Sequence, residues 1–254
     1  MKYAPILLFL FAAAAGCQGD FDPDDVFVAA GATAETPASG APVGQATGTI
    51  LPTPDPVVSE TFLPVVQHAY FPLEPGTFRI YEGDKEGLPR RDEIRVLHGY
   101  RVILDVECTQ AFQQVYLDGE LVEVTTEWFA QDQQGNVWKF GEASFALEEG
   151  LFVLDDDSWL AGEEGALPWL FLAADPQVGD VYVEIRPDGQ DTVVVLSVSE
   201  SESVPVGQFD NCLQVLENPD DPDDQDLIIY GPGVGMLSEE HDDGRIELTA
   251  FGRE

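Results

Sequence analysis

Short apolar runs separated by tight turns fill the chain from about Tyr70 to its C-terminus. In residues 122–128, every second side chain is Val, Thr or Trp and the positions between them are Glu or Thr. This period of two is typical of a strand with one face in water. Residues 181–186 repeat the alternation, with Glu184 on the face expected to be wet. Further strand-like runs are residues 77–82, 92–97, 102–108, 192–198, 208–216, 227–230 and 246–251.

Dipeptides that end in glycine lie between these runs. Glycine supplies the positive φ that a two-residue hairpin requires, so the strands on either side are expected to be antiparallel neighbours. The pairs are Asp118-Gly119, Gln134-Gly135, Glu149-Gly150, Asp188-Gly189 and Asp243-Gly244. No stretch of ten residues with helical periodicity interrupts them. The pattern predicts a mainly β fold, a single antiparallel meander curled into an open barrel or sandwich. Residues 166–173 are apolar on every face and are predicted to cross this barrel as a buried segment.

The first 60 residues differ in composition from the rest of the chain. Residues 18–60 are rich in Ala, Gly, Pro, Thr and Asp and carry few large apolar side chains. Such a segment cannot bury enough surface to offset the entropy lost on ordering. The sequence therefore predicts a signal peptide over residues 1–17, a disordered, flexible tether over 18–60 and one all-β domain over 61–254.

The N-terminus has the layout of a bacterial lipoprotein signal. Lys2 precedes an apolar run over residues 6–15 that is too short to span a bilayer, and small residues lead to Cys17. We expect cleavage before Cys17 and attachment of a lipid to it, which would anchor the chain to a membrane. The alternative is an ordinary secretory signal with a coincidental cysteine, since Ala14 occupies a position where leucine is usual.

Charge narrows the range of partners. The chain has 48 acidic and 11 basic residues, for a net charge of −37. Such a surface repels phosphates, which excludes nucleic acid as a partner. Two interpretations stay open: a solvated acidic coat that keeps the protein soluble, or a surface that gathers cations or basic ligands.

The cysteine count fits an exported protein. Of the three cysteines, lipid attachment would use Cys17 and leave Cys108 and Cys212 as a pair. An oxidising compartment permits a disulfide between them, and neither lies at the spacing of a zinc or redox motif. The alternation places Cys108 on one face with Val102 and Leu104.

One predicted hairpin carries the candidate binding residues. Its tryptophans are either core aromatics or a ligand platform. Its polar residues are harder to explain by packing, although a solvated hairpin rim is the alternative. The candidate set is Glu127, Trp128, Asp132, Asn136, Trp138 and Glu142.

Signals for metals and catalysis are weak. The acidic runs at residues 155–157 and 220–226 do not fit an EF-hand loop and are expected to be solvated. The three histidines are scattered, and neither a Gly-x-Ser-x-Gly elbow nor an HExxH motif occurs. We therefore expect no enzyme, no cofactor and no metal site.

A succession of short motifs resembles a known group of proteins. In order, they are YFPLEPGT at 70–77, EWFAQD at 127–132, GNVWKFGE at 135–142, PQVGD at 176–180, VPVGQF at 204–209 and YGPGVG at 230–235. The succession is similar to a family of uncharacterised bacterial envelope proteins, many of them lipoproteins. The resemblance runs from Tyr70 to about Glu240. It implies a location and a fold, and no activity.

These patterns together predict a lipid-anchored protein of the bacterial cell envelope with a non-catalytic β domain. The domain is expected to bind a small apolar molecule or an envelope protein; a purely structural component and an unrecognised hydrolase are the alternatives. A cavity lined by Val, Leu and Trp would favour ligand binding, and a filled interior would favour a structural role. Buried, hydrogen-bonded carboxylates facing one cleft would favour a hydrolase.

Overall fold

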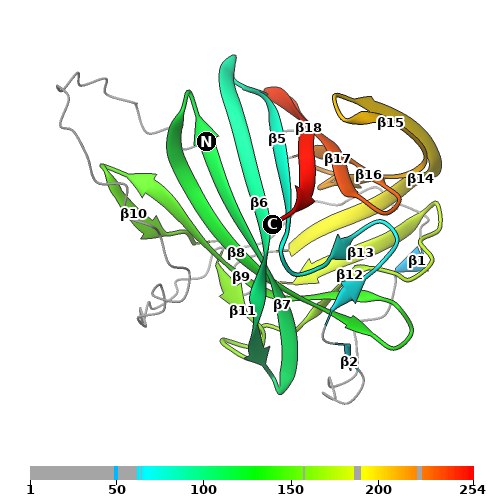
Figure 1. Ribbon diagram of the computed structural model, residues 1–254. Coiled ribbons are helices and arrows are strands. Elements are labelled where there is room, and N and C mark those ends of the chain that lie inside the picture. Colours follow the sequence, from blue (N-terminus) through cyan, green and yellow to red (C-terminus); the bar gives the residue numbers. More distant parts are fainter. Residues whose placement is uncertain (1–48, 51–61, 64, 157, 186–189, 222–224) are drawn as a thin grey trace. The chain divides into compact units, whose positions relative to one another are not determined.

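Strands make up the regular structure of the part of the chain that the computed structural model describes, residues 49–50, 62–63, 65–156, 158–185, 190–221 and 225–254 (Figure 1). All of these belong to one structural unit, residues 39–254. Within them there is no helix of the length and apolarity needed to cross a membrane. The predicted signal peptide, its Cys17, most of the predicted tether and the turn at 188–189 lie outside the described residues.

The strands differ greatly in length. Four short ones come first: β1 (Thr49–Ile50), β2 (Phe62–Leu63), β3 (Val66–Gln67) and β4 (Pro72–Leu73). Five long ones follow: β5 (Thr77–Lys85), β6 (Leu88–Ile103), β7 (Val106–Leu117), β8 (Glu120–Asp132) and β9 (Val137–Glu148). Then come β10 (Leu151–Leu154), β11 (Trp159–Leu160) and β12 (Trp169–Leu172). The last six are β13 (Asp180–Ile185), β14 (Gln190–Val204), β15 (Gly207–Glu217), β16 (Asp226–Gly231), β17 (Gly235–His241) and β18 (Gly244–Arg253).

Sixteen of these strands form one sheet, in the order β1-β13-β14-β15-β16-β17-β18-β5-β6-β7-β8-β9-β10. β11 and β12 also pair with β9, and β2 pairs with β8, while β3 and β4 pair only with each other. The long strands are antiparallel to their neighbours, and the sheet path ends at β1 and β10 without closing. The predicted mainly β, open antiparallel architecture is confirmed. The meander consists of two runs of strands, β13–β18 and β5–β10, which are joined where β18 pairs with β5.

Turn chemistry explains the correct predictions and one wrong one. Asp118-Gly119 and Glu149-Gly150 join consecutive strands. Their φ angles are 49° at Asp118, 50° at Glu149 and 82° at both glycines. The predicted strand over residues 102–108 is wrong, because Leu104 and Asp105 form the turn between β6 and β7 with φ of 50° and 63°. Neither residue is glycine, so the turn signal was absent. Leu104 is 44% exposed rather than on the face of Cys108.

Residues 166–173 do not cross the sheet. Trp169–Leu172 instead form β12, which pairs antiparallel with β9. Trp169 and Leu172 are buried, and Leu167 is 54% exposed. A run that is apolar on every face thus became a sheet strand, because backbone groups in a buried segment need partners and β9 supplies them.

Part of the predicted tether belongs to the sheet. Thr49 and Ile50 pair in parallel with Asp180 and Val181 of β13. The composition of residues 18–60 averages over the segment and hides these two β-branched residues, which suit a strand.

The predicted disulfide is wrong. Cys108 on β7 and Cys212 on β15 are both free, buried thiols. β7 and β15 are not neighbours in the sheet, and the two residues belong to different apolar clusters. Burial raises the pKa of both thiols, that of Cys108 to about 12, so neither is a reactive thiolate at neutral pH.

Candidate functional site

An interior cavity of about 390 Å³ lies between β5–β9 on one side and β12–β17 on the other. This volume is within the range of small-molecule sites. Charged side chains reach it from both sides. Its carboxylates are Glu123, Glu127, Glu142, Glu184, Asp191, Glu217 and Glu239. Its cations among the described residues are Arg79, Arg90 and Lys139.

Carboxylates face one another directly across neighbouring strands at three places. The register pairs Glu127 with Glu142, Glu184 with Asp191, and Glu217 with Asp226. Like charges that lie directly opposite in a sheet destabilise it. Cross-strand partners share a face, so all three pairs belong to the cavity side of the sheet. The repetition shows that negative charge is concentrated there rather than scattered.

Lys139 holds one of these pairs together. Its Nζ lies 2.9 Å from Glu127 Oε1 and 2.7 Å from Glu142 Oε2. Burial alone would lower the pKa of Lys139, but the charges of Glu127, Glu142 and Glu184 outweigh burial and raise the pKa well above its usual value. The side chain is therefore a permanent ammonium ion between two carboxylates.

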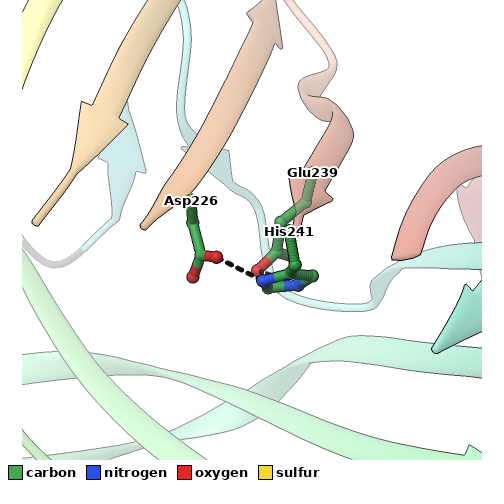
Figure 2. A group of neighbouring side chains, drawn as sticks. All are labelled: Asp226, Glu239 and His241. Atoms are coloured by element: carbon green, nitrogen blue, oxygen red, sulfur yellow. Dashed lines mark hydrogen bonds and ion pairs between the residues drawn. The ribbon is translucent and has the colours of Figure 1, made fainter. Parts of the chain in front are cut away.

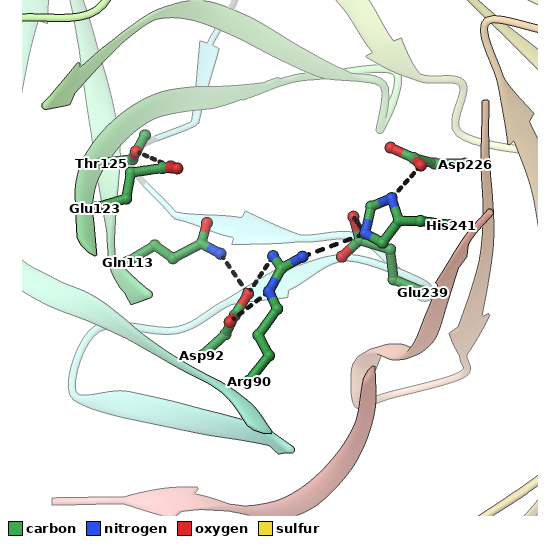
Figure 3. Close-up of polar contacts among 8 residues, drawn as sticks. All are labelled: Arg90, Asp92, Gln113, Glu123, Thr125, Asp226, Glu239 and His241. Carbon is green, nitrogen blue, oxygen red and sulfur yellow. Dashed lines mark hydrogen bonds and ion pairs between the residues drawn. The ribbon is translucent and has the colours of Figure 1, made fainter. Parts of the chain in front are cut away.

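A second network links β6 and β7 to β16 and β17 (Figure 3). Arg90 donates two hydrogen bonds to the fully buried Asp92, Nε to Oδ1 at 3.0 Å and Nη2 to Oδ2 at 2.8 Å. Gln113 Nε2 donates to Asp92 Oδ2 at 3.0 Å. Arg90 Nη1 also lies 3.3 Å from His241 Nε2. The Arg90 guanidinium thus lies between the Asp92 carboxylate and the His241 ring.

His241 lies between two carboxylates (Figure 2). Its Nδ1 contacts Asp226 Oδ1, and its Nε2 lies 3.3 Å from Glu239 Oε1. Hydrogen bonds to Asp226 and Glu239 raise the pKa of His241 to about 10, so the ring is a cation at neutral pH. Together with Arg90, it brings two cations side by side among the carboxylates of the network.

The same three residues are the metal-ligand candidates of the described chain. One ligand atom from each of Asp226, Glu239 and His241 lies within 4.8 Å of the others, and carboxylate and imidazole ligands suit zinc. A metal ion would have to displace the imidazolium proton and would stand beside the Arg90 guanidinium. In the metal-free protein the three residues form an ion-pair network.

The ionisation of Glu217 is strongly altered at the cavity. Burial, together with the charges of Glu239 and Asp226, raises its pKa from 4.5 to about 8. Glu217 is therefore mostly protonated at pH 7. Glu217 becomes negatively charged only when a cation binds beside it or when the pH rises.

Aromatic rings line the rest of the cavity. This aromatic wall consists of Phe71, Phe129, Trp169, Phe171 and Tyr230. Phe171 is central to it, with ring centroids 4.6 Å from Phe71, 5.2 Å from Phe129 and 5.6 Å from Trp169. The cavity therefore combines rigid ring surfaces with carboxylates.

The candidate residues of the predicted hairpin divide into two sets. Glu127 and Glu142 line the cavity. The others are structural. Asp132 Oδ2 accepts hydrogen bonds from Asn136 Nδ2 at 2.8 Å and Trp138 Nε1 at 2.9 Å, which stabilises the turn between β8 and β9. Trp128 is buried, donates to Gln110 at 3.1 Å and lies under Arg101.

Sequence reasoning missed most of the site. Arg90, Glu184, Glu217, Glu239 and His241 were not among the candidates. The sequence did contain a signal for Glu184, which lies on the polar face of an alternating strand. That face was interpreted as exposed to water. In the structure Glu184 is buried and faces the cavity.

Comparisons with known proteins add little. No family model matches the chain, and no curated protein matches it. A crystal structure that is similar comes from Bacteroides fragilis, a protein described as thought to be exported and as having a YmcC-like fold. It is 12% identical, with a TM-score of 0.43, and the match covers 73% of this chain and all of that one. A similarity this weak carries no argument about function.

Proposed function

We propose that this protein is a lipid-anchored envelope protein whose β domain binds a small polar molecule in its interior cavity. The observation that carries the proposal is the cavity of about 390 Å³ between the two runs of strands, whose described lining includes seven carboxyl side chains and three cations. An apolar ligand, which the sequence suggested, does not suit this lining, because charged groups lose hydration without gaining partners when an apolar molecule covers them.

The cost of the lining supports a binding role over a structural one. Buried charges stabilise a fold less than apolar side chains of similar volume, and like-charge pairs weaken a sheet. A spacer in the envelope has no use for them. Features that break the rules of stable folding are concentrated at functional sites.

The location rests on the N-terminal sequence. The layout around Cys17 supports lipid attachment, and the net charge of −37 supports a soluble domain held beside the membrane rather than embedded in it. In this proposal, residues 18–48 connect the lipid at Cys17 to the domain and set its distance from the membrane.

A variant with a filled cavity tests binding. Ala111 is buried and lines the cavity, so Ala111→Phe places a ring in it. Ala146→Phe on β9, outside the lining, is the matched control. The thermal midpoint of each protein is measured against a panel of small amines, alcohols, amino acids and carboxylic acids. A ligand at about a hundred times its Kd stabilises by about 2.7 kcal/mol, which raises the midpoint of a domain of this size by about 5–10 °C.

We expect at least one compound to stabilise the wild type and Ala146→Phe but not Ala111→Phe. If no compound separates Ala111→Phe from the other two proteins, the proposal is wrong.

Hydrolysis is the second candidate function, and Glu217 is the observation that favours it. A carboxyl group with a pKa near 8 opposite an acidic partner, Asp226, is suited to general acid catalysis. Chromogenic glycosides and esters test this candidate. Turnover that Glu217→Gln abolishes would establish it over simple binding.

A further inference from the structure

We propose that the ligand of the cavity is an organic amine in its ammonium form, bound between the carboxylates and the aromatic wall. This inference rests on the proposed function, since it names the chemical class of the molecule that occupies the same cavity. Three observations carry it: the partners that the cavity's own cations already have, the two carboxylates that bind Lys139, and the aromatic rings that line the same cavity.

The cations of the cavity are already engaged. Arg79 donates to two backbone carbonyls, those of Val234 and Pro72, both at 2.6 Å. Arg90 binds Asp92, and Lys139 binds Glu127 and Glu142. Among the described lining residues, an incoming anion would therefore meet three cations that already have hydrogen-bond partners and a larger number of carboxyl groups.

Lys139 shows how carboxylates of this cavity bind an ammonium group. Two carboxylates that lie opposite across β8 and β9 hold its Nζ at 2.9 and 2.7 Å. Two further pairs repeat this cross-strand arrangement, Glu184 with Asp191 on β13 and β14 and Glu217 with Asp226 on β15 and β16. A second ammonium group beside Glu184 and Glu217, one carboxyl group from each of these two pairs, would donate charge-assisted hydrogen bonds to them, and Glu217 would release its proton to solvent as the ammonium group binds.

The aromatic wall selects an organic cation over a metal ion. A cation near the face of Trp, Tyr or Phe is attracted by the ring, and the attraction is largest where water is excluded. Trp169 and Phe171 of β12 lie on the same cavity as Glu184 of β13. Carbon-bearing ammonium ions gain from these rings as well as from the carboxylates, whereas a hydrated metal ion gains only from the carboxylates.

Isothermal titration calorimetry with three probes of the same chain length tests the inference. Diaminobutane, butanediol and succinate share a four-carbon chain and differ in charge. Each is titrated into the full chain at pH 7 in about 0.15 M salt, where exposed charges are screened beyond about 8 Å. The cavity variants are Glu184→Gln and Glu217→Gln. The matched surface variant is Glu120→Gln combined with Glu148→Gln, both exposed.

We expect diaminobutane alone to bind, about tenfold or more weaker to each cavity variant and unchanged to the surface variant. Equal binding to all variants, or loss in the surface variant, would show adsorption to the acidic surface and overturn the inference. Binding of butanediol or succinate that Ala111→Phe blocks, without binding of diaminobutane, would overturn it and leave the proposed function standing. Zinc or calcium binding at the cavity without amine binding would overturn it as well. Both proposals are wrong if none of the three probes gives a heat of binding and if, in the thermal-midpoint panel, no compound distinguishes Ala111→Phe from the wild type.

Discussion

Removal of the charge of Lys139 should cost a large part of the protein's stability. In Lys139→Met the side chain keeps its length and loses its charge, which leaves Glu127 and Glu142 directly opposed and without their cation. The side chains of Lys139, Glu142 and Glu127 are 8%, 15% and 25% exposed, so little water is available to screen the two carboxylates.

Breaking a buried ion pair by removing one partner costs about 3–5 kcal/mol, and the partial exposure of Glu127 places this case near the lower end. We expect the free energy of unfolding to fall by about 3 kcal/mol and the thermal midpoint by about 6–12 °C. Urea unfolding followed by tryptophan fluorescence measures the loss. Lys85→Met, at an exposed lysine of β5, is the control and should change stability by less than about 0.5 kcal/mol.

The cause is tested by removing the repulsion itself. Lys139→Met combined with Glu127→Gln and Glu142→Gln has no charge at this place, and it should regain stability to within about 1 kcal/mol of the wild type. A loss below about 1 kcal/mol in Lys139→Met, or no recovery in the triple variant, would refute the reasoning. If Lys139→Met does not fold, a folded triple variant still supports the account and an unfolded one contradicts it.

Four further predictions follow from other parts of the chain. Because the pKa of Glu217 is raised to about 8 in the folded state, the folded protein keeps a proton that the unfolded chain loses above about pH 4.5. The free energy of unfolding should therefore fall between about pH 4.5 and 8, and urea titrations at each pH should show a smaller fall for Glu217→Gln. Deletion of residues 18–48 should leave the thermal midpoint within a few degrees, while deletion of 18–60 also removes β1 and should lower it further; equal midpoints would show that β1 contributes nothing. Cys17→Ser should move the protein from the membrane fraction to the soluble fraction or stall its processing, and unchanged fractionation would remove the lipid anchor. The net charge of −37 should make stability rise between about 0.01 and 1 M NaCl, and a flat profile would show that the charges are too far apart to repel.

The alternation of side chains was enough to predict the class of fold and most strands. Residues 122–128 fall within β8 and residues 181–185 within β13, because the period of two follows from the pleat of the strand alone. Turns were predictable where glycine supplies the positive φ, as at Gly119 and Gly150. The turn at Leu104-Asp105 was missed, because the pairing of β6 with β7 leaves these two exposed non-glycine residues in that conformation.

The site depended on the tertiary structure. Alternation shows that the two faces of a strand differ, but it does not say what covers the polar face. Glu127 of β8 and Glu184 of β13 both belong to faces expected in water, and both line the cavity because the two runs of strands lie opposite each other. Glu217 and Glu239 reach that cavity from strands far along the chain from Lys139. Local residue patterns carry no information about such distant pairs, so only the folded sheet brings these charges together and alters their ionisation.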